Sequence, residues 1–342
     1  MPEPVAERAG RWDLSGATSA TGELFNQIHE RIVFLQRLHF EEYIPTLGSD
    51  HITDFESRLE RWLDNLPSES DRQTLFEFVP SIIFFGRAEF SKLYQAALRG
   101  PVARWIIDDS ALDLTSPDFD QQLHNEIHHH TWYCAVSDSM QISDFCHANH
   151  LGGVEYRPDL RTLSKFGDLN KILEFMQNRR DAHHRPMPLR RIVILEDFIG
   201  SGTQLNDAEP MINQLLEKSV PLLLVPLIIC PDGVDFIRRR FGAEPLFHLA
   251  PVLQLDMDLF INSRTTPPPD SVNGKIQRLA QDCYPQVIGD DAARPRPYGP
   301  FGFSDTGALV VLYSNTPANT LPIVQHSSND WVALFPRSAR VR

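Results

Sequence analysis

The stretch Arg191-Ile-Val-Ile-Leu-Glu-Asp-Phe-Ile-Gly-Ser-Gly-Thr-Gln204 decides the fold of this chain. Its first part, 192–195, is a short run of branched apolar residues, which is typical of a strand buried on both faces of a parallel sheet. The adjacent acids Glu196 and Asp197 follow, and then a small, glycine-bearing turn. Apolar residues at helical spacing over 205–216 indicate a helix after the turn. This order of strand, acidic pair, turn and helix predicts an α/β fold.

The same order of elements suits a sugar phosphate. N–H groups at a helix start bind anions, and Gly200 and Gly202 let a phosphate approach the backbone closely. Ser201 and Thr203 add hydroxyl donors, and Gln204 closes the segment. The carboxylates just upstream can accept hydrogen bonds from the vicinal hydroxyls of a ribose. We therefore expect a ribose 5-phosphate ligand here, with an ordinary capped strand-to-helix turn as the alternative.

Two better-known phosphate sites do not fit this stretch. The G-x-G-x-x-G order of a dinucleotide site is missing, and so is the Gly-Lys-Ser/Thr end of a P-loop. Instead, 195–204 resembles the phosphoribosyl-diphosphate-binding signature of type I phosphoribosyltransferases. In that family a hydrophobic strand leads into two acidic residues, two apolar residues and a Thr/Ser-Gly-x-Thr loop.

The resemblance implies a parallel sheet with flanking helices and a ribose held by Glu196 and Asp197. It also implies Mg²⁺ that arrives with phosphoribosyl diphosphate, without direct protein ligands. Two positions depart from the family pattern. Gly200 stands where some purine-specific members carry an acidic residue that acts as a base, and Gln204 stands where a Thr usually donates to the phosphate. The departures put base catalysis from the loop and tight phosphate binding in doubt.

A second resemblance lies near the C-terminus. The stretch Asn315-Thr-Pro-Ala-Asn-Thr-Leu-Pro322 and its surroundings over 302–337 are similar to the C-terminal signature of a bacterial phosphoribosyltransferase-like family associated with conflict systems, including antiphage defence. This resemblance extends from about residue 20 to the end. It implies that Asn315, Asn319 and Thr320 line the pocket mouth, where a hood reads the acceptor base. A turn network that holds two strands together is the alternative.

A further loop follows the strand predicted at 131–136. In type I phosphoribosyltransferases the loop after an early strand holds the pyrophosphate, which points to Ser137, Asp138 and Ser139 here. A plain Ser/Asp turn explains them as well, and the loop has no basic residue of its own. Basic residues that could screen a pyrophosphate, or merely be surface charges, occur in the interval of the family's mobile loop: Arg157, Arg161 and Lys165.

The chain divides into three predicted parts. Residues 1–20 are rich in Ala, Gly, Ser and charge and are expected to be a flexible leader. Residues 21–100 read as a helical extension that packs on the rest or binds a protein partner. Residues 101–342 read as the phosphoribosyltransferase-like α/β domain with its C-terminal hood region. After the signature, alternating helical and strand patterns over 204–253 predict further parallel strands.

Composition narrows the function classes. Among 342 residues, 42% hydrophobic and 23% charged content is normal for a globular chain. The net charge of −13 argues against a general nucleic-acid surface and against acidic membranes, and no apolar run approaches the ~20 residues of a membrane span. Four scattered cysteines indicate free thiols and a cytoplasmic location. His124 and His128 share a helix face, so zinc is conceivable beside the plainer interpretation of exposed histidines.

Three functional hypotheses remain. The first is phosphoribosyl transfer to an unknown acceptor in a bacterial defence context. The second is a non-catalytic nucleotide-ligand sensor or regulatory partner, which Gly200, Gln204 and the lack of a basic pyrophosphate loop favour. The third is a nucleobase salvage enzyme, which the long N-terminal and C-terminal extensions disfavour.

Overall fold

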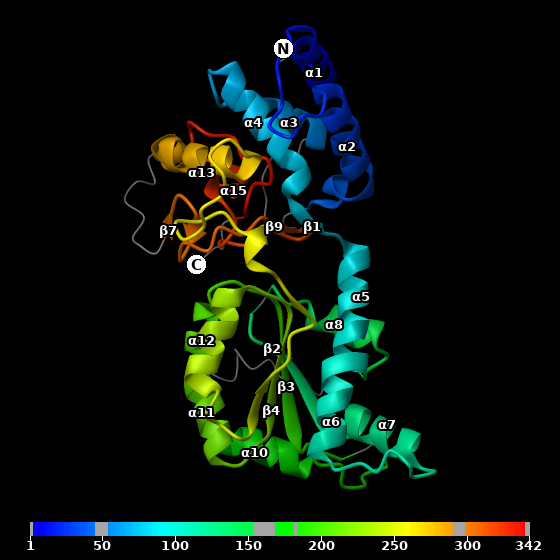
Figure 1. Ribbon diagram of the computed structural model, residues 1–342. Coiled ribbons are helices and arrows are strands. Elements are labelled where there is room, and N and C mark those ends of the chain that lie inside the picture. The colour runs from blue at the N-terminus through cyan, green and yellow to red at the C-terminus, as the bar shows by residue number, and fades with distance from the viewer. Residues whose placement is uncertain are drawn as a thin grey trace. The chain divides into compact units, whose positions relative to one another are not determined.

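A computed structural model describes residues 3–44, 54–137, 139–152, 168–180, 183–289 and 298–338. The chain forms two compact units (Figure 1). The central unit is Ala88–Asp256, and the split unit joins Met1–Arg87 to Met257–Arg342.

The central unit contains a parallel sheet and the helices around it. Its strands are β2 (Thr131–Ala135), β3 (Arg191–Ile199), β4 (Leu222–Ile229), β5 (Phe247–Leu249) and β6 (Leu253–Gln254). Its helices are α5 (Arg87–Ala97), the π-helical turn η3 (Leu98–Val102), α6 (Ala103–Asp109), α7 (Phe119–His129), α8 (Ile142–Ala148), α10 (Leu169–Asn178), the 3-10 turn η5 (Thr203–Asp207), α11 (Glu209–Glu217) and α12 (Pro231–Phe241).

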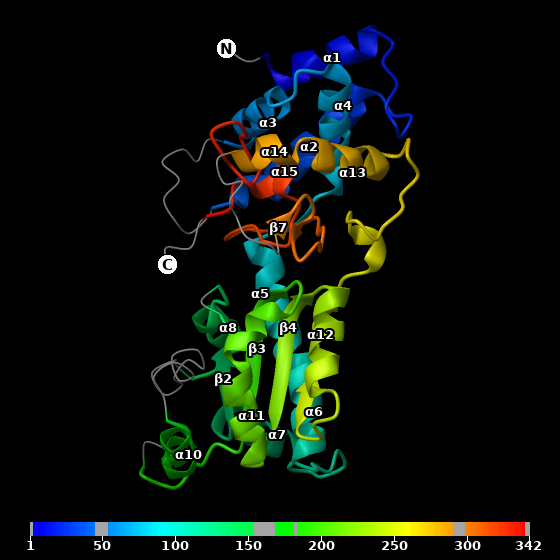
Figure 2. The same ribbon diagram turned by 90° about the vertical axis from the view of Figure 1, so that its left-hand side faces the viewer.

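The strands run in the order β2-β3-β4-β5, with β6 also paired to β4, and all pairs are parallel. Right-handed crossovers between consecutive parallel strands place their helices on one face of a sheet. Accordingly, α11 and α12 cover one face while α5 and α6 lie on the other (Figures 1 and 2). The predicted α/β class with a parallel sheet and flanking helices is confirmed.

The quoted strand is buried on both faces, as its continuous apolar run predicts. Toward one face Ile192 and Ile194 join a core with Ile212 of α11. On the other face the ring of Tyr133 in β2 lies 5.6 Å from that of Phe145 in α8. Both layers fix the position of β3, and with it the residues that follow Leu195.

The split unit is mainly helical. Its helices are α1 (Val5–Leu14), α2 (Phe25–Leu38), η1 (Phe40–Glu42), α3 (Phe55–Asp64), α4 (Glu69–Phe78), η2 (Val79–Ser81), η6 (Met257–Leu259), α13 (Val272–Asp282), α14 (Tyr284–Ile288) and α15 (Pro322–Gln325). Its short strands are β1 (Ile83–Phe85) with its parallel partner β9 (Val310–Leu312), and the hairpin of β7 (Tyr298–Gly299) and β8 (Gly302–Phe303).

The expectation of a flexible leader over 1–20 is wrong. Helix α1 occupies most of this stretch, and Val5, Ala9 and Trp12 on it are at most 1% exposed. The indole N–H of Trp12 donates to Glu69 of α4 over 2.6 Å. These three residues recur at helical spacing and form one apolar stripe. The helix was missed because most other residues of this stretch are polar or charged.

The predicted boundaries at 21–100 and 101–342 also differ from the structure. Residues of the C-terminal segment complete the core of the N-terminal helices: the Phe335 ring lies 5.3 Å from that of Phe40 and 5.7 Å from that of Phe55. The indole of Trp62 in α3 donates to the carbonyl of Ile323 over 2.6 Å. The N-terminal helices need an apolar partner to bury their faces. The C-terminal segment is that partner, although Trp62 and Ile323 are 261 positions apart in the chain.

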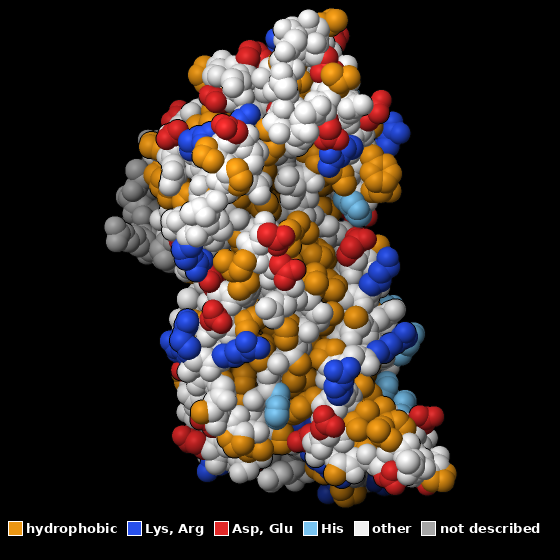
Figure 3. All heavy atoms as spheres, in the orientation of Figure 1, with side chains coloured by type: hydrophobic (Ala, Val, Ile, Leu, Met, Phe, Trp, Pro, Cys, Tyr) orange, Lys and Arg blue, Asp and Glu red, His pale blue; other side chains and the backbone are white. Residues whose placement is uncertain are grey.

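Helix α2 presents apolar side chains to solvent. Phe34 and Leu38, one turn apart, are 62% and 49% exposed, and hydrophobic side chains are visible along this helix in Figure 3. The predicted partner contact through the N-terminal helices stays a prediction. Across the described residues, no helix combines the length and apolar character needed to cross a membrane.

Candidate functional site

The acidic pair lies inside a strand, not after one. We predicted a strand end at Leu195, but β3 continues to Ile199. On one side, pairing with β2 stops at Ala135↔Leu195, while on the other side β4 pairs with β3 as far as Ile199↔Ile229. Glu196 and Asp197 therefore stay in the sheet but lie beyond the end of β2, where the loop after β2 takes its place.

Glu196 is almost completely enclosed, with 1% of its surface exposed. One carboxylate oxygen accepts from the backbone N–H of Ser137 over 3.0 Å, and the other accepts from the side-chain amide of Gln204 over 3.1 Å. Burial, and next the charge of Asp197, raise the pKa of Glu196 to about 8, against the two hydrogen bonds, which lower it. Burial therefore favours the protonated form of this carboxyl group.

Asp197 binds the same loop through its side chain. Its Oδ1 accepts from its neighbour Phe198 N over 2.8 Å and from the hydroxyl of Ser139 over 3.1 Å. The hydroxyls of Ser139 and Ser137 lie 2.6 Å apart. The structure thus brings the predicted Ser137 and Ser139 together with both acids. In the sequence, Ser137 is 59 positions from Glu196 and Ser139 is 58 positions from Asp197.

Several predicted residues cannot be placed in this arrangement. Asp138 lies outside the described residues. The same holds for Arg157, Arg161 and Lys165, the predicted cations of the mobile loop.

The glycine turn is held against α12. Gly202 has φ +83°, which side-chain-bearing residues rarely adopt, and a Cβ there would lie 2.7 Å from the ring of Phe236. A Cβ on Gly233, near the start of α12, would lie 2.8 Å from the carbonyl oxygen of Gly200. We did not identify Phe236 or Gly233 from the sequence. The signal in the sequence was Gly233 itself, because a glycine at the start of a helix lets another part of the backbone approach closely.

The turn does not lead directly into an α-helix, as we had predicted. The 3-10 turn η5 comes first, and α11 begins only at Glu209. Pro210 explains the later start, because proline lacks an N–H and is favoured in the first turn of a helix. An anion at the glycine turn would therefore be held by local N–H groups, not by a long helix dipole.

Such N–H groups are present. Within the described ranges, no hydrogen-bond acceptor is found for the backbone N–H groups of Ser201, Gly202, Thr203 and Gln204. The hydroxyls of Ser201 and Thr203 lie 3.0 Å apart beside them. Successive backbone N–H groups in a tight turn make a concave anion site. The segment 200–204 has the donors that a phosphate requires.

The three predicted hood residues lie in the split unit and bind within it. The side chain of Asn319 donates to Thr306 Oγ1 over 2.9 Å, and Thr320 Oγ1 donates to the carbonyl of Val310 over 2.5 Å. Asn315 accepts from two backbone N–H groups through Oδ1. These contacts fit the alternative of a turn network, while a role at a pocket mouth stays a prediction.

The histidines of α7 form a cluster without metal geometry. The rings of His124 and His128 stack with centroids 4.1 Å apart. In the part of the chain that the structure describes, no group of three or more His, Cys, Asp or Glu side chains could hold a metal ion.

In the comparison with known proteins, the chain matches the model of a protein family. The model of PRTase-CE, a phosphoribosyltransferase-like family of conflict systems, matches residues 59–337, which includes the acidic pair and the glycine turn. Curated proteins and solved structures yield no match to the chain.

Proposed function

The chain belongs to the PRTase-CE family, and on this basis we propose that the 196–204 segment binds phosphoribosyl diphosphate or a related ribose 5-phosphate ligand. The chain would then transfer the phosphoribosyl group to an acceptor in a bacterial defence context. In that transfer the bond from the anomeric carbon to pyrophosphate breaks, and a bond from the same carbon to the acceptor forms.

The observation that carries the proposal is the row of free backbone donors over 201–204. Ser201 and Gly202 are buried, while Thr203 and Gln204 are partly exposed. Buried N–H groups without partners are rare in folded proteins, because leaving each one unpaired costs about 1–3 kcal/mol. A 5-phosphate supplies three acceptor oxygens to such a row. Support from α12, through Phe236 against Gly202, keeps the turn in the shape that the phosphate needs.

The ribose hydroxyls would bind at the acidic pair. The hydroxyl of Ser139 now donates to Asp197, and the amide of Gln204 donates to Glu196. A vicinal diol offers the same kind of donor, so Ser139 and Gln204 are the groups that a ribose would displace. Asp197 would accept from one hydroxyl, and Glu196 would bind the other.

Mg²⁺ would come with the ligand. In phosphate-binding sites this ion keeps several waters and is held largely by substrate oxygens, and the described residues offer no cluster that could hold it alone. When bound, it neutralises charge on the pyrophosphate leaving group.

Calorimetry with phosphoribosyl diphosphate, ribose 5-phosphate and ribose, in the presence of Mg²⁺, tests this proposal. We expect the two phosphorylated ligands to bind and ribose to bind far more weakly. If neither phosphorylated ligand binds at millimolar concentration, the proposal is wrong.

A second candidate function is a sensor that binds the ligand without turning it over. The hydrogen bond from Gln204 to Glu196 favours the sensor. Gln204 stands in place of the family's phosphate-binding Thr, and it bonds to a carboxyl group that a ribose would need. Release of pyrophosphate over a panel of nucleobases separates the two. Release supports the transferase, and binding without release supports the sensor.

A further inference from the structure

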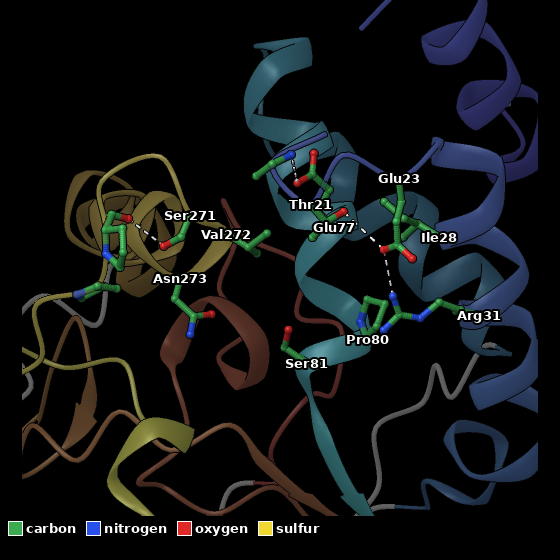
Figure 4. A pocket seen from close by; sticks show the side chains of 13 residues that line it. Thr21, Glu23, Ile28, Arg31, Glu77, Pro80, Ser81, Ser271, Val272 and Asn273 are labelled. Carbon is green, nitrogen blue, oxygen red and sulfur yellow. Dashed lines mark hydrogen bonds and ion pairs between the residues drawn. The ribbon is translucent and has the colours of Figure 1, made fainter. Parts of the chain in front are cut away.

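The split unit contains a pocket of about 400 Å³ that the proposed function does not use. It is lined by α2, by the end of α4 with η2, and by the start of α13 with the prolines before it. In Figure 4 the residues of α13 lie on one side and those of α2 on the other. Pockets that bind small molecules usually have a volume of about 300–1,000 Å³, so this one has room for a small organic ligand.

Glu77 is the buried acid of this pocket. Only 6% of its surface is exposed, and one carboxylate oxygen accepts from the backbone N–H of Ala20 over 2.8 Å. Among the described residues the second oxygen has no hydrogen-bond donor. This oxygen is not among the fully enclosed side-chain atoms that lack a partner, so it is accessible from the pocket, and a ligand with an N–H group can donate to it.

The charges around Glu77 select the sign of the ligand. The lining has one other acid, Glu23, which pairs with Arg31 over 3.0 Å, so this pair is neutral as a whole. Burial raises the pKa of Glu77, against the hydrogen bond from the Ala20 N–H and the charge of Lys275, which lower it. No ion pair joins Glu77 to Lys275 in the described ranges. Glu77 is therefore the lining acid with which a cationic group can pair, and a bound cation would favour its ionised form.

The remaining lining is partly apolar. Ile28 of α2, Val272 of α13 and the prolines Pro80, Pro267 and Pro268 contribute hydrocarbon, and the uncharged polar residues of the lining are Thr21, Ser81, Ser271 and Asn273. Proline rings and branched side chains pack well against flat hydrocarbon. The pocket thus combines one buried acid with apolar side chains on which a hydrocarbon body can pack.

We propose that this pocket binds a small organic cation, with an amidinium, guanidinium or ammonium group on Glu77 and a flat apolar body between Ile28 and Val272. The inference goes beyond the proposed function and does not depend on it, because every residue that carries it belongs to the split unit.

Benzamidinium, benzamide and benzoate test the proposal, since the three probes share one shape and differ in charge. Methyl NMR of the full chain, labelled at Ile and Val, would record titrations with each probe. We expect the signals of Ile28 and Val272 to move with benzamidinium at millimolar concentration, and at least tenfold weaker binding of benzamide and benzoate. Equal binding of benzamidinium and benzamide, or no response at these two residues, would overturn the proposal.

A variant pair locates the charge. Glu77→Gln keeps the shape of the side chain and should weaken benzamidinium binding at least fivefold. Glu56→Gln, at an exposed position of α3 outside the pocket, removes one charge from the same unit and should leave binding unchanged. Equal losses in both variants would show attraction to the overall negative charge alone and refute a site at Glu77. The comparison of probes on the unmodified chain stands even if Glu77→Gln fails to fold.

Discussion

The side-chain amide of Gln204 donates to Oε1 of Glu196 over 3.1 Å, and to the carbonyl of Phe198 over 2.7 Å. The residue that departs from the family pattern in the phosphate turn is thus bonded to the first acid of the ribose site. The two halves of the candidate site are coupled by one side chain.

Removing that side chain should change the acidity of Glu196. The hydrogen bond from Gln204 lowers the pKa of Glu196 against the effect of burial. In a Gln204→Ala variant the pKa should therefore rise above its value of about 8. Carboxyl ¹³C NMR titration measures the change. Gln214→Ala, at an exposed position of α11, is the control. An unchanged pKa in Gln204→Ala would show that this hydrogen bond does not form in solution.

Glu196 should also make stability depend on pH. Its pKa is raised from 4.5 to about 8 on folding, so between these values the folded chain binds a proton that the unfolded chain has lost. Stability from this group is therefore present below about pH 4.5, falls as pH rises through the window, and levels off above about 8. The slope is at most about 1.4 kcal/mol per pH unit.

A Glu196→Gln variant lacks this proton and should lose the slope. Relative to the unmodified chain, its free energy of unfolding should increase progressively from pH 5 to about 8. Urea unfolding of both chains across this range gives the difference. The exposed Glu56→Gln should show no such trend. Parallel pH profiles for Glu196→Gln and the unmodified chain would contradict a raised pKa.

Asp197 should contribute more to ligand affinity than any other side chain of the site. A hydrogen bond to a charged group contributes about 1.5–3 kcal/mol, so Asp197→Asn should weaken phosphoribosyl diphosphate binding about 10- to 100-fold. Calorimetry measures the affinity, with Asp144→Asn, an exposed position in α8, as the control. An unchanged affinity in Asp197→Asn would refute the assignment of the ribose site.

Gly202 should be intolerant of any side chain. Gly202→Ala places a Cβ 2.7 Å from Phe236 and strains a φ of +83°, which together should cost about 1–3 kcal/mol of stability. A double-mutant cycle with Phe236→Ala measures the contribution of the ring contact. The double variant should cost less than the sum of the single variants, because Phe236→Ala removes the ring atoms 2.7 and 2.8 Å away, although its Cβ stays at 2.9 Å. Simple additivity would show that α12 does not press on the turn.

Trp12 tests whether the first helix is part of the fold. The side chain is 1% exposed, so Trp12→Ala should cost about 3–5 kcal/mol of unfolding free energy. Leu14→Ala on the same helix, where the side chain is 92% exposed, should cost less than about 0.5 kcal/mol. Thermal unfolding of both variants gives the comparison. Equal, small effects would restore the flexible leader that we first expected.

The sequence by itself determined the parallel sheet and the acid–glycine segment. An apolar run such as 192–195 is stable only with both faces covered, and the spacing of residues in 205–216 requires one buried helix face. These are local patterns with one physical solution, so they could be predicted from neighbouring residues alone. The choice of Glu196, Asp197 and the turn over 200–204 as the candidate site followed from the same patterns.

Only the tertiary structure decided what those residues touch. Three of these contacts join distant segments of the chain. Ser137 and Ser139 bond to the acids, 59 positions separating Ser137 from Glu196, and Phe236 supports Gly202. Phe335 packs against Phe40 in the core of the N-terminal helices. Many apolar faces are equally suitable partners for one helix, and no local pattern selects among them. The selection comes from packing all segments together at once, since a dense core accepts few arrangements of its side chains.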